Sequence, residues 1–398
     1  MNKKEKFAII HNMNYVICHY NEIGLKGGNR KFFEEKLIEN IKNFLDPSLY
    51  FFIKRISGRF IIKLTAEGEK NQKNIEKKLK NIFGLANFSF ASETEQNINA
   101  IKRSALETLE QEQFKSFKVF TQRSNKNFNL TSQEINKIVG ETIVENLKKK
   151  VDLENPDATL FIEIAEDKAF FYLKKITGLG GLPTGVSGKG LVLLSDGIDS
   201  PVAAWQMIKR GMKVSFIHFH SYTDQEEEAT EKVKKIALVL SKYQGRSILY
   251  LAPFKEIQKK ILEQQTRDCC LICKRMMFKI AGEIAKTEGI NALITGDSLG
   301  QVASQTIENM GIIEDKTNLP VLRPLIGFDK QETIEKAKEM GTYEISILPT
   351  SFYCQQFLPK HPRTKGNLKQ VEKTEEELFD KKTILGAVKD VKTIKIGY

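Results

Sequence analysis

The sequence has few cysteines and no long run of uncharged apolar residues. Its five cysteines are odd in number and clustered, which excludes a secreted disulfide framework and favours reduced thiols. No run of about 18 uncharged apolar residues occurs, so we expect no membrane-spanning helix. Residues 11–14 interrupt the apolar N-terminal stretch, and no small-residue cleavage site follows, which excludes a signal peptide. We therefore expect a cytoplasmic protein without a membrane partner.

Acidic residues are the minority among the charged ones. The chain has 62 Lys and Arg against 50 Asp and Glu, a net charge of +12. This excess indicates either a lysine-rich solvated surface or a polyanionic partner such as a nucleic acid, and charge alone does not separate the two. The length of 398 residues suits two or three domains, and a hydrophobic content of 41% is enough for their cores.

Residues 1–75 have the β-α-β rhythm of a small ferredoxin-like domain. A strand and a turn are followed by an amphipathic helix with apolar residues at three- and four-residue spacing. Two strands joined at Ser57-Gly58 come next. A further helix then ends at Gly84 and leads into another strand.

Residues 76–177 repeat the alternation of helices and strands. Helices are predicted at 97–111 and 131–150, and a hairpin turns at Glu166-Asp167. Basic and aromatic residues interleave on the strands, as on RNA-binding surfaces, although we expect at least half of these aromatics in the core. The interleaved residues are Phe120, Arg123, Lys126, Phe128, Phe171, Tyr172, Lys174 and Lys175.

A change of pattern marks the third segment, residues 178–398. Six glycines and a proline between Gly178 and Gly190 indicate a linker or a functional loop. Short apolar strands then alternate with helices, which predicts a doubly wound parallel sheet with a ligand crevice at the carboxyl ends of its strands. The fold class is therefore α/β, in several domains.

A polar turn at Ser195–Ser200, here called the phosphate loop, joins a buried strand to a helix. Backbone N–H groups at such a turn bind anions, and hydroxyls add donors. The Walker pattern G-x-x-x-x-G-K-[ST] is absent. The turn instead resembles the SGGxDS loop of the PP-loop ATP pyrophosphatases, which adenylate a substrate and release pyrophosphate. Asp196 stands at a glycine position of that loop, and we expect its side chain to turn outward or to face magnesium.

Four segments resemble the tRNA 4-thiouridine synthetase family: His19–Arg30, Gly178–Ala203, Thr295–Thr306 and Arg323–Ile347. The resemblance implies a ferredoxin-like domain, a THUMP RNA-binding domain and a PP-loop pyrophosphatase domain, in that order. It implies that ATP adenylates O4 of uridine 8 in tRNA and that sulfur displaces AMP to leave 4-thiouridine. Bacterial relatives also supply sulfur for thiamine thiazole synthesis.

The resemblance implies an ATP site at the ends of the parallel strands. Asp297 is a candidate magnesium ligand or an ordinary helix cap, since carboxylates near phosphates often bind Mg²⁺. The residues that match nucleotide contacts of the family are Leu193, Leu194, Ser195, Gly197, Asp199, Ser200, His218, Phe219, Arg275, Gly296 and Gln305.

The cysteines are where the sequence departs from the commoner bacterial pattern. Cys354 matches the family's cysteine in the pyrophosphatase domain, and Cys270 and Cys273 form a C-x-x-C motif. The chain stops at Tyr398, so we expect a short form without the C-terminal rhodanese domain. Three interpretations are open: structural zinc, a redox pair, or a [4Fe-4S] cluster held by these three cysteines. Rhodanese-less relatives favour the cluster, whose open iron would bind hydrosulfide.

We therefore expect Asp199 and the three cysteines Cys270, Cys273 and Cys354 to carry the chemistry. The implied partners are tRNA and a sulfur donor, either sulfide or a cysteine desulfurase, and a homodimer is compatible with the family. Two rivals remain: a non-catalytic tRNA-binding THUMP protein, which Asp196 favours, and a PP-loop thiolase of another tRNA position. The intact Asp199 and Ser200 oppose the first rival.

Overall fold

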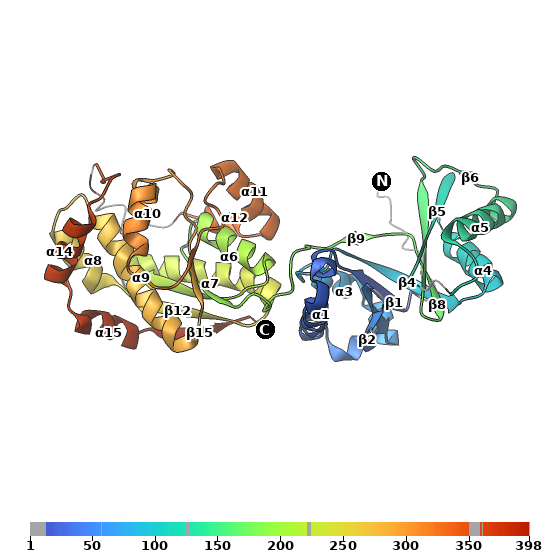
Figure 1. The fold of residues 1–398 in the computed structure, drawn as a ribbon, viewed down its shortest axis with the longest axis horizontal. Coiled ribbons are helices and arrows are strands. Elements are labelled where there is room, and N and C mark those ends of the chain that lie inside the picture. Colours follow the sequence, from blue (N-terminus) through green and yellow to red (C-terminus); the bar gives the residue numbers. More distant parts are fainter. Residues whose placement is uncertain are drawn as a thin grey trace. The chain divides into compact units, whose positions relative to one another are not determined.

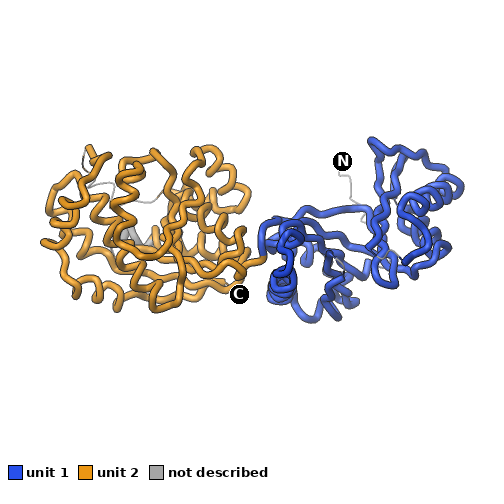
Figure 2. Tube along the Cα trace, viewed as in Figure 1, with its two compact units in different colours: residues 1–182 blue, residues 183–398 orange. Residues whose placement is uncertain are grey.

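The computed structural model describes residues 13–56, 58–110, 112–124, 127–220, 224–349, 359 and 361–397. The chain divides into two compact units, Met1–Leu182 and Pro183–Tyr398, coloured separately in Figure 2. The boundary falls within the glycine-rich stretch, which therefore contains the linker between the units. The finer division at residues 75 and 177 stays a prediction.

The ferredoxin-like half of the first unit is built on an antiparallel sheet with the strand order β2-β3-β1-β4. Helices α1 and α3 cover this sheet, and a core of nineteen buried residues, including Val16, Leu37 and Phe88, lies between them. Cys18 is fully buried in this core, as expected of a small apolar residue, and burial raises the pKa of its thiol. The elements are β1 (Tyr15–His19), α1 (Arg30–Phe44), β2 (Tyr50–Ile56), β3 (Arg59–Leu64), α2 (Ala66–Lys70), α3 (Gln72–Leu79) and β4 (Asn87–Glu95).

The second half of this unit packs two helices, α4 and α5, on one face of its strands (Figure 1). The predicted hairpin forms β7 and β8, and Glu166 at its turn adopts a positive φ of 51°. Strand β4 pairs with β1 on one side and with β8 on the other, so both halves share one sheet of nine strands. The elements are α4 (Ile98–Leu109), β5 (Ser116–Arg123), α5 (Ser132–Leu147), β6 (Lys150–Val151), β7 (Ala158–Ala165), β8 (Lys168–Tyr172) and β9 (Ile176–Thr177).

The second unit has a six-stranded sheet in the order β14-β13-β10-β11-β12-β15. Five strands are parallel, as the sequence predicts, and β15 adds an antiparallel edge that it did not predict. The strands are β10 (Lys189–Leu193), β11 (Lys213–His220), β12 (Ser247–Pro253), β13 (Ala292–Ile294), β14 (Val321–Leu322) and β15 (Lys392–Ile396).

Helices cover both faces of this sheet (Figure 1). The long α9 lies in the larger core together with α8, α14 and α15, whereas α6 and α7 contact one another over the other face. The helices are α6 (Asp199–Lys209), α7 (Asp224–Gln244), α8 (Lys255–Glu263), α9 (Cys269–Glu288), α10 (Ile307–Glu314), α11 (Lys330–Met340), α12 (Tyr343–Ser346), α14 (Leu368–Leu378) and α15 (Lys381–Lys389).

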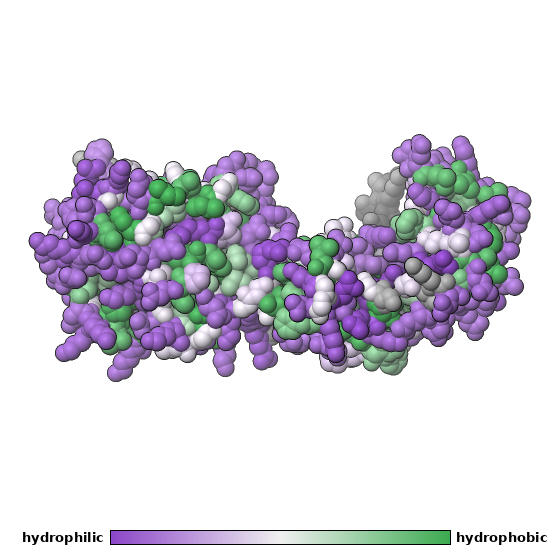
Figure 3. Space-filling model, viewed as in Figure 1, coloured by the Kyte–Doolittle hydropathy of each residue, from purple (hydrophilic) through white to green (hydrophobic). Residues whose placement is uncertain are grey.

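Hydrophilic residues dominate the surface drawn in Figure 3, and the hydrophobic ones gather in small separate patches. Within the described residues, no helix has both the length and the apolar composition that crossing a bilayer requires.

Candidate active site

The phosphate loop leaves the end of β10 and enters the first turn of α6. The Ser200 hydroxyl accepts a hydrogen bond from the backbone N–H of Ser195 (2.9 Å), and the two hydroxyl oxygens lie 3.0 Å apart. The N–H of Gly197 donates to the Ser195 hydroxyl at 3.3 Å. These contacts close the turn over the amino end of α6, where the helix dipole and unpaired N–H groups favour an anion.

Gly296, which follows β13, lies against the same helix start. A Cβ atom at this position would stand 2.6 Å from the backbone nitrogen of Ser200 and 2.7 Å from the carbonyl carbon of Asp199, so only glycine fits. Strand β11, which follows β10 in the sequence, lies on one side of β10 in the sheet, and the later strand β13 lies on its other side. This is the switch point at which doubly wound sheets bind ligands, and Gly296 and the phosphate loop meet there.

The Asp199 carboxylate is held by two side chains from distant segments. Lys330 Nζ at the start of α11 lies 2.7 Å from Oδ1, and the Gln301 amide donates to Oδ2 at 3.0 Å. The Lys330 side chain is about half exposed. The lysine therefore places a positive charge at the mouth of the phosphate loop.

Asp196 does not turn outward, so that part of the expectation is wrong, and the other part, that it faces magnesium, is not tested. The residue is 1% exposed, and its Oδ2 atom lies 3.2 Å from the ammonium of Lys232 on α7, which is itself buried. A buried carboxylate requires a partner, and the lysine supplies it.

Asp297 lies at the centre of several donors. Its carboxylate accepts hydrogen bonds from Thr295 (2.7 Å), from Gln305 (3.0 Å) and from Lys274 (3.0 Å), and Arg323 Nε stands 3.7 Å away. Burial acts to raise the pKa of Asp297, but the Lys274 charge and these hydrogen bonds outweigh it and lower the pKa below its usual value. Asp297 is thus an anchor for Gln305 and Lys274 rather than a helix cap.

The ends of β10 and β11 lie side by side next to the phosphate loop. His218 Nδ1 is 3.0 Å from the carbonyl oxygen of Leu194, and Phe219 packs edge-on against Phe254. Leu193 is partly buried, whereas Leu194 is 2% exposed. Their proximity to the loop is what an adenine contact requires, and that role stays a prediction.

Arg275 lies away from these residues. Its side chain is fully buried, and its Nε atom donates to Glu375 on α14 at 2.7 Å, while Nη1 donates to the carbonyl oxygen of Ile312 on α10. The guanidinium therefore links three helices. A nucleotide contact by Arg275 stays a prediction that these contacts do not favour, and Lys274 is the neighbouring residue whose side chain reaches the site.

The C-x-x-C cysteines lie in the first turns of α9. Cys270 is partly exposed, Cys273 is buried, and the two lie about one helical turn apart. Cys354, the third predicted ligand, lies outside the described residues. Those residues contain no group of three or more Cys, His, Asp or Glu side chains arranged to hold a metal. Two of the three predicted cluster ligands, Cys270 and Cys273, are thus among the described residues, and the cluster stays a prediction.

Sequence reasoning missed the charged residues that complete the site: Lys232, Lys274 and Lys330, together with Gln301. Lys330 and Gln301 lie in two of the segments that carry the family resemblance, which was the available signal. Nothing in the sequence distinguishes a single lysine among 62 basic residues, because the carboxylate that it pairs with depends on the three-dimensional fold.

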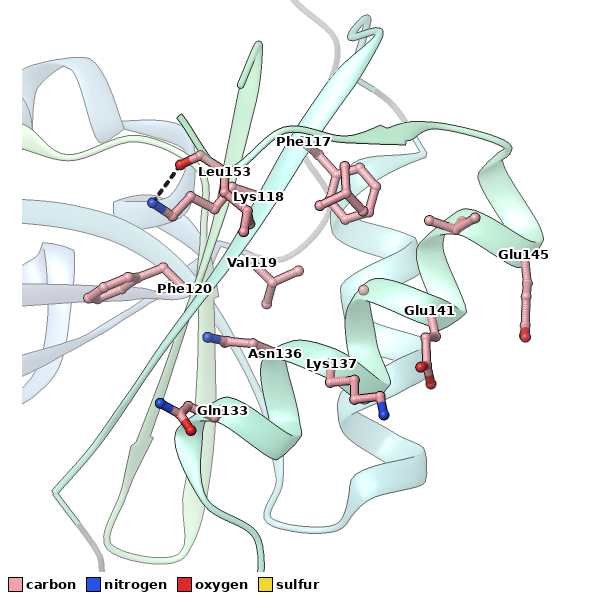
Figure 4. Close-up of a pocket in the computed structure, with 13 residues that line it drawn as sticks. Phe117, Lys118, Val119, Phe120, Gln133, Asn136, Lys137, Glu141, Glu145 and Leu153 are labelled. Atoms are coloured by element: carbon pink, nitrogen blue, oxygen red, sulfur yellow. Dashed lines mark hydrogen bonds between the residues drawn. The ribbon is translucent and has the colours of Figure 1, made fainter. Parts of the chain in front are cut away.

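The first unit contains a groove of about 620 Å³ between β5 and α5 (Figure 4). Exposed apolar side chains at its rim include Phe120 (43% exposed) and Leu153 (65%), and Lys118 donates to the carbonyl of Leu153 at 3.0 Å. Lys175 Nζ lies 5.6 Å from the centre of the Phe120 ring. Figure 4 shows Phe120 pointing away from α5, and the groove itself also contains the acidic Glu141 and Glu145. The aromatic and basic pair of Phe120 and Lys175 therefore lies on the face of β5 opposite the groove, where it suits the bases and backbone of RNA.

Three family models match this chain. The model described as thiamine biosynthesis protein (ThiI) matches residues 185–379, the THUMP domain matches 95–174, and the ThiI ferredoxin-like domain matches 15–89. Their order is the one that the sequence resemblance implied, and the expected fold class is confirmed.

Curated relatives match over nearly their whole length. A probable tRNA sulfurtransferase of Thermoanaerobacter pseudethanolicus is 43% identical over 93% of this chain and 96% of its own. The probable tRNA sulfurtransferase of Clostridium kluyveri is 42% identical over 96% of this chain and 99% of its own. Among solved structures, a 4-thiouridine synthetase in complex with RNA and bound ATP superposes with a TM-score of 0.86 at 38% identity, covering 96% of this chain and 99% of that one. PH1313 of Pyrococcus horikoshii superposes with a TM-score of 0.66 at 28% identity, covering 82% of this chain and 99% of that one.

Proposed function

The chain belongs to the ThiI family, and from this we propose that it is an ATP-dependent tRNA sulfurtransferase that makes 4-thiouridine at position 8 of tRNA. Its curated relatives carry the name tRNA sulfurtransferase, and a 4-thiouridine synthetase with bound ATP and RNA aligns with 96% of the chain. That alignment over the full domain order is the observation that carries the proposal.

The reaction needs two displacements. The uracil O4 attacks the α-phosphorus of ATP, so that the bond to pyrophosphate breaks and an O4-adenylate forms. A sulfur nucleophile then attacks C4, and AMP leaves with the former O4. A carbonyl oxygen is a poor leaving group, and AMP is a good one.

The phosphate loop has the groups that the first step requires. Its N–H donors and the hydroxyls of Ser195 and Ser200 would bind the pyrophosphate portion of ATP, and Lys330 would neutralise charge that develops there. We assign to Asp199 the task of holding Lys330 and Gln301 at the loop. This intact arrangement opposes a decayed, non-catalytic THUMP protein.

We propose that the face of β5 that carries Phe120 binds tRNA. The exposed Phe120 ring with Lys175 above it would stack on an unpaired base, and Lys118 lies on the same strand for the backbone. Recognition of this kind relies on shape and stacking, as is usual for RNA.

For the sulfur step we propose a [4Fe-4S] cluster held by Cys270, Cys273 and Cys354. Cys270 and Cys273 lie about one turn apart near the start of α9, which supports the proposal. When bound, such a cluster would supply an iron atom able to bind sulfide. Transfer through a Cys354 persulfide is the alternative.

Magnesium is proposed only as the counterion that ATP brings with it. Each of the loop-side carboxylates Asp196, Asp199 and Asp297 already contacts a lysine, so the described residues do not fit a protein-held Mg²⁺, and we assign it no step. The sulfur donor, a homodimer, a role in thiazole synthesis and a cytoplasmic location stay predictions.

One experiment tests the function and the sulfur source together. Protein purified without oxygen is analysed for iron and absorption, then assayed for tRNA thiolation with ATP and sulfide. We expect ATP-dependent 4-thiouridine in the wild type and a loss of at least about a hundredfold in Asp199→Ala, because loop and lysine would be misplaced. Glu335→Ala, an exposed change on α11, is the matched control and should retain activity.

Three outcomes would contradict parts of this proposal. Absence of thiolation with any sulfur source would favour the RNA-binding rival. Thiolation at another tRNA position would favour the second rival. A colourless, iron-free protein that thiolates fully would eliminate the cluster and leave persulfide transfer.

A further inference from the structure

A buried ion pair links the phosphate loop to two other parts of the second unit. Asp196 and Lys232 have side chains that are 2% and 6% exposed, and Lys232 Nζ lies 3.2 Å from Asp196 Oδ2. The same ammonium donates to the carbonyl oxygen of Leu348 at 2.7 Å. The loop is thereby tied both to α7 and to the chain that follows α12.

A second contact runs between the same two segments. The hydroxyl of Ser346, at the end of α12, donates to the carbonyl oxygen of Gly197 at 3.2 Å. Two neighbouring loop residues, Asp196 and Gly197, are therefore held from the same short stretch, Ser346–Leu348. Contacts on consecutive residues restrict both the position and the rotation of the loop backbone.

A buried carboxylate is unusual beside a site that is suited to phosphate. A carboxylate beside a phosphate site repels the anion, and burying it adds a desolvation cost. Asp196 has a negative φ, so the backbone does not require an aspartate or a glycine here. What makes the carboxylate tolerable is the lysine, which cancels its charge and is itself positioned by it.

We propose that Asp196 and Lys232 are a positioning pair for the phosphate loop, and that ATP affinity depends on the pair as a unit. This inference rests on the proposed function, because it takes ATP as the ligand of the loop. Neither residue contacts the reacting atoms. Loss of the lysine alone would leave a buried negative charge next to the triphosphate, whereas loss of both charges would return the loop to the glycine pattern of PP-loop enzymes.

The test is a double-mutant cycle in which the Kd of ATP is measured for the wild type, the two single variants and the double variant. We expect Lys232→Met to weaken ATP binding at least about tenfold and Asp196→Gly by no more than about threefold, with the double variant recovering to within about threefold of the wild type. A pair that only stabilises the fold would instead leave the Kd of ATP unchanged in every variant that folds, and losses that add would mean that the two side chains act independently. In turnover, the KM for ATP should rise in Lys232→Met while the KM for tRNA is unchanged.

The matched control is Lys235→Met, an exposed lysine on the same helix, which should bind ATP as the wild type does. If Lys232→Met does not fold, as judged by its thermal transition, recovery of folding and ATP binding in the double variant still supports the pair. A double variant as weak as Lys232→Met, or a Lys232→Met variant with wild-type affinity, overturns the inference. Wild-type protein that binds no ATP contradicts the proposed function itself.

Discussion

Short polar contacts determine the positions of the charged side chains around the phosphate loop. Asp199, Asp196 and Asp297 each face a different lysine, and each lysine comes from a different helix. The carboxylates thus do not add negative charge to the anion site. They hold three ammonium groups near it, which is the electrostatic condition for binding a triphosphate.

Gly296→Ala tests the close approach of two chain segments at this site. The added methyl would stand 2.6 Å from Ser200 N and 2.7 Å from the Asp199 carbonyl carbon, so the start of α6 must shift. We expect the Kd of ATP to rise by roughly tenfold or more, since such displacements misplace the binding groups. Isothermal titration with ATP measures the change.

Gly282→Ala is the matched control for that substitution. Gly282 lies inside α9, and its added methyl would meet only Thr317 Oγ1 at 3.7 Å, an ordinary contact. This variant should be more stable by about 0.5–1 kcal/mol, because alanine is the better helix former, and should bind ATP normally. Equal ATP affinity in both variants would contradict the close approach.

The helices and strands of the second unit illustrate what local pattern does and does not predict. The alternation of apolar strands with helices predicted β10 to β13 and their parallel pairing, because hydrophobic periodicity is a local property. The antiparallel edge strand β15 was missed, since Lys392–Ile396 alternates charged and apolar residues and pairs only through a partner far away in sequence. The double pairing of β4 also depends on distant segments, because its partners β1 and β8 belong to different halves of the first unit.

At the site, too, local features could be predicted from the sequence and contacts between distant segments could not. The glycine and serine pattern of the phosphate loop is local, so its position could be predicted from Ser195–Ser200 alone. The partner of Asp196 and the placement of Arg275 could not, because both depend on which helix packs beside which strand. Arg275 follows a candidate metal ligand by two positions, yet its side chain leaves α9 in the direction of Glu375.

Arg275→Met tests the arginine as a link between α9, α10 and α14. The guanidinium is fully buried, and its removal takes one charge from the buried Glu375 and one donor from the Ile312 carbonyl. Lys316 remains 3.2 Å from Glu375, so we expect the free energy of unfolding to fall by about 3 kcal/mol, the lower end for breaking a buried pair. Urea denaturation measures it.

Lys279→Met, an exposed change on the same helix, should stay within about 0.5 kcal/mol of the wild type. The affinity of the folded Arg275→Met variant for ATP separates the two roles of the arginine. Unchanged affinity assigns it to the fold alone. A large loss of affinity at full folding would restore the nucleotide contact that the sequence predicted.

We expect the first unit to bind RNA and the second to carry the chemistry. The first unit, Met1–Leu182, contains Phe120 and the THUMP match, and the second, Pro183–Tyr398, contains the phosphate loop and the cysteines of α9. The net charge of +12 is a property of both together. A polyanionic substrate that must reach both units makes use of such an excess, because phosphate contacts supply most of the affinity for nucleic acids.

The salt dependence of tRNA binding distinguishes this use of charge from simple solvation. If the protein neutralises about six phosphates, the affinity should fall by about a thousandfold between 50 and 200 mM salt, because bound counterions are released on association. Phe120→Ala should weaken binding at every salt concentration by about 1–3 kcal/mol and leave the slope unchanged, since stacking releases no counterions. Filter binding over a salt series measures both quantities. A flat salt dependence would mean that the lysines serve solubility, and a changed slope in Phe120→Ala would mean that the ring orients a phosphate contact rather than a base.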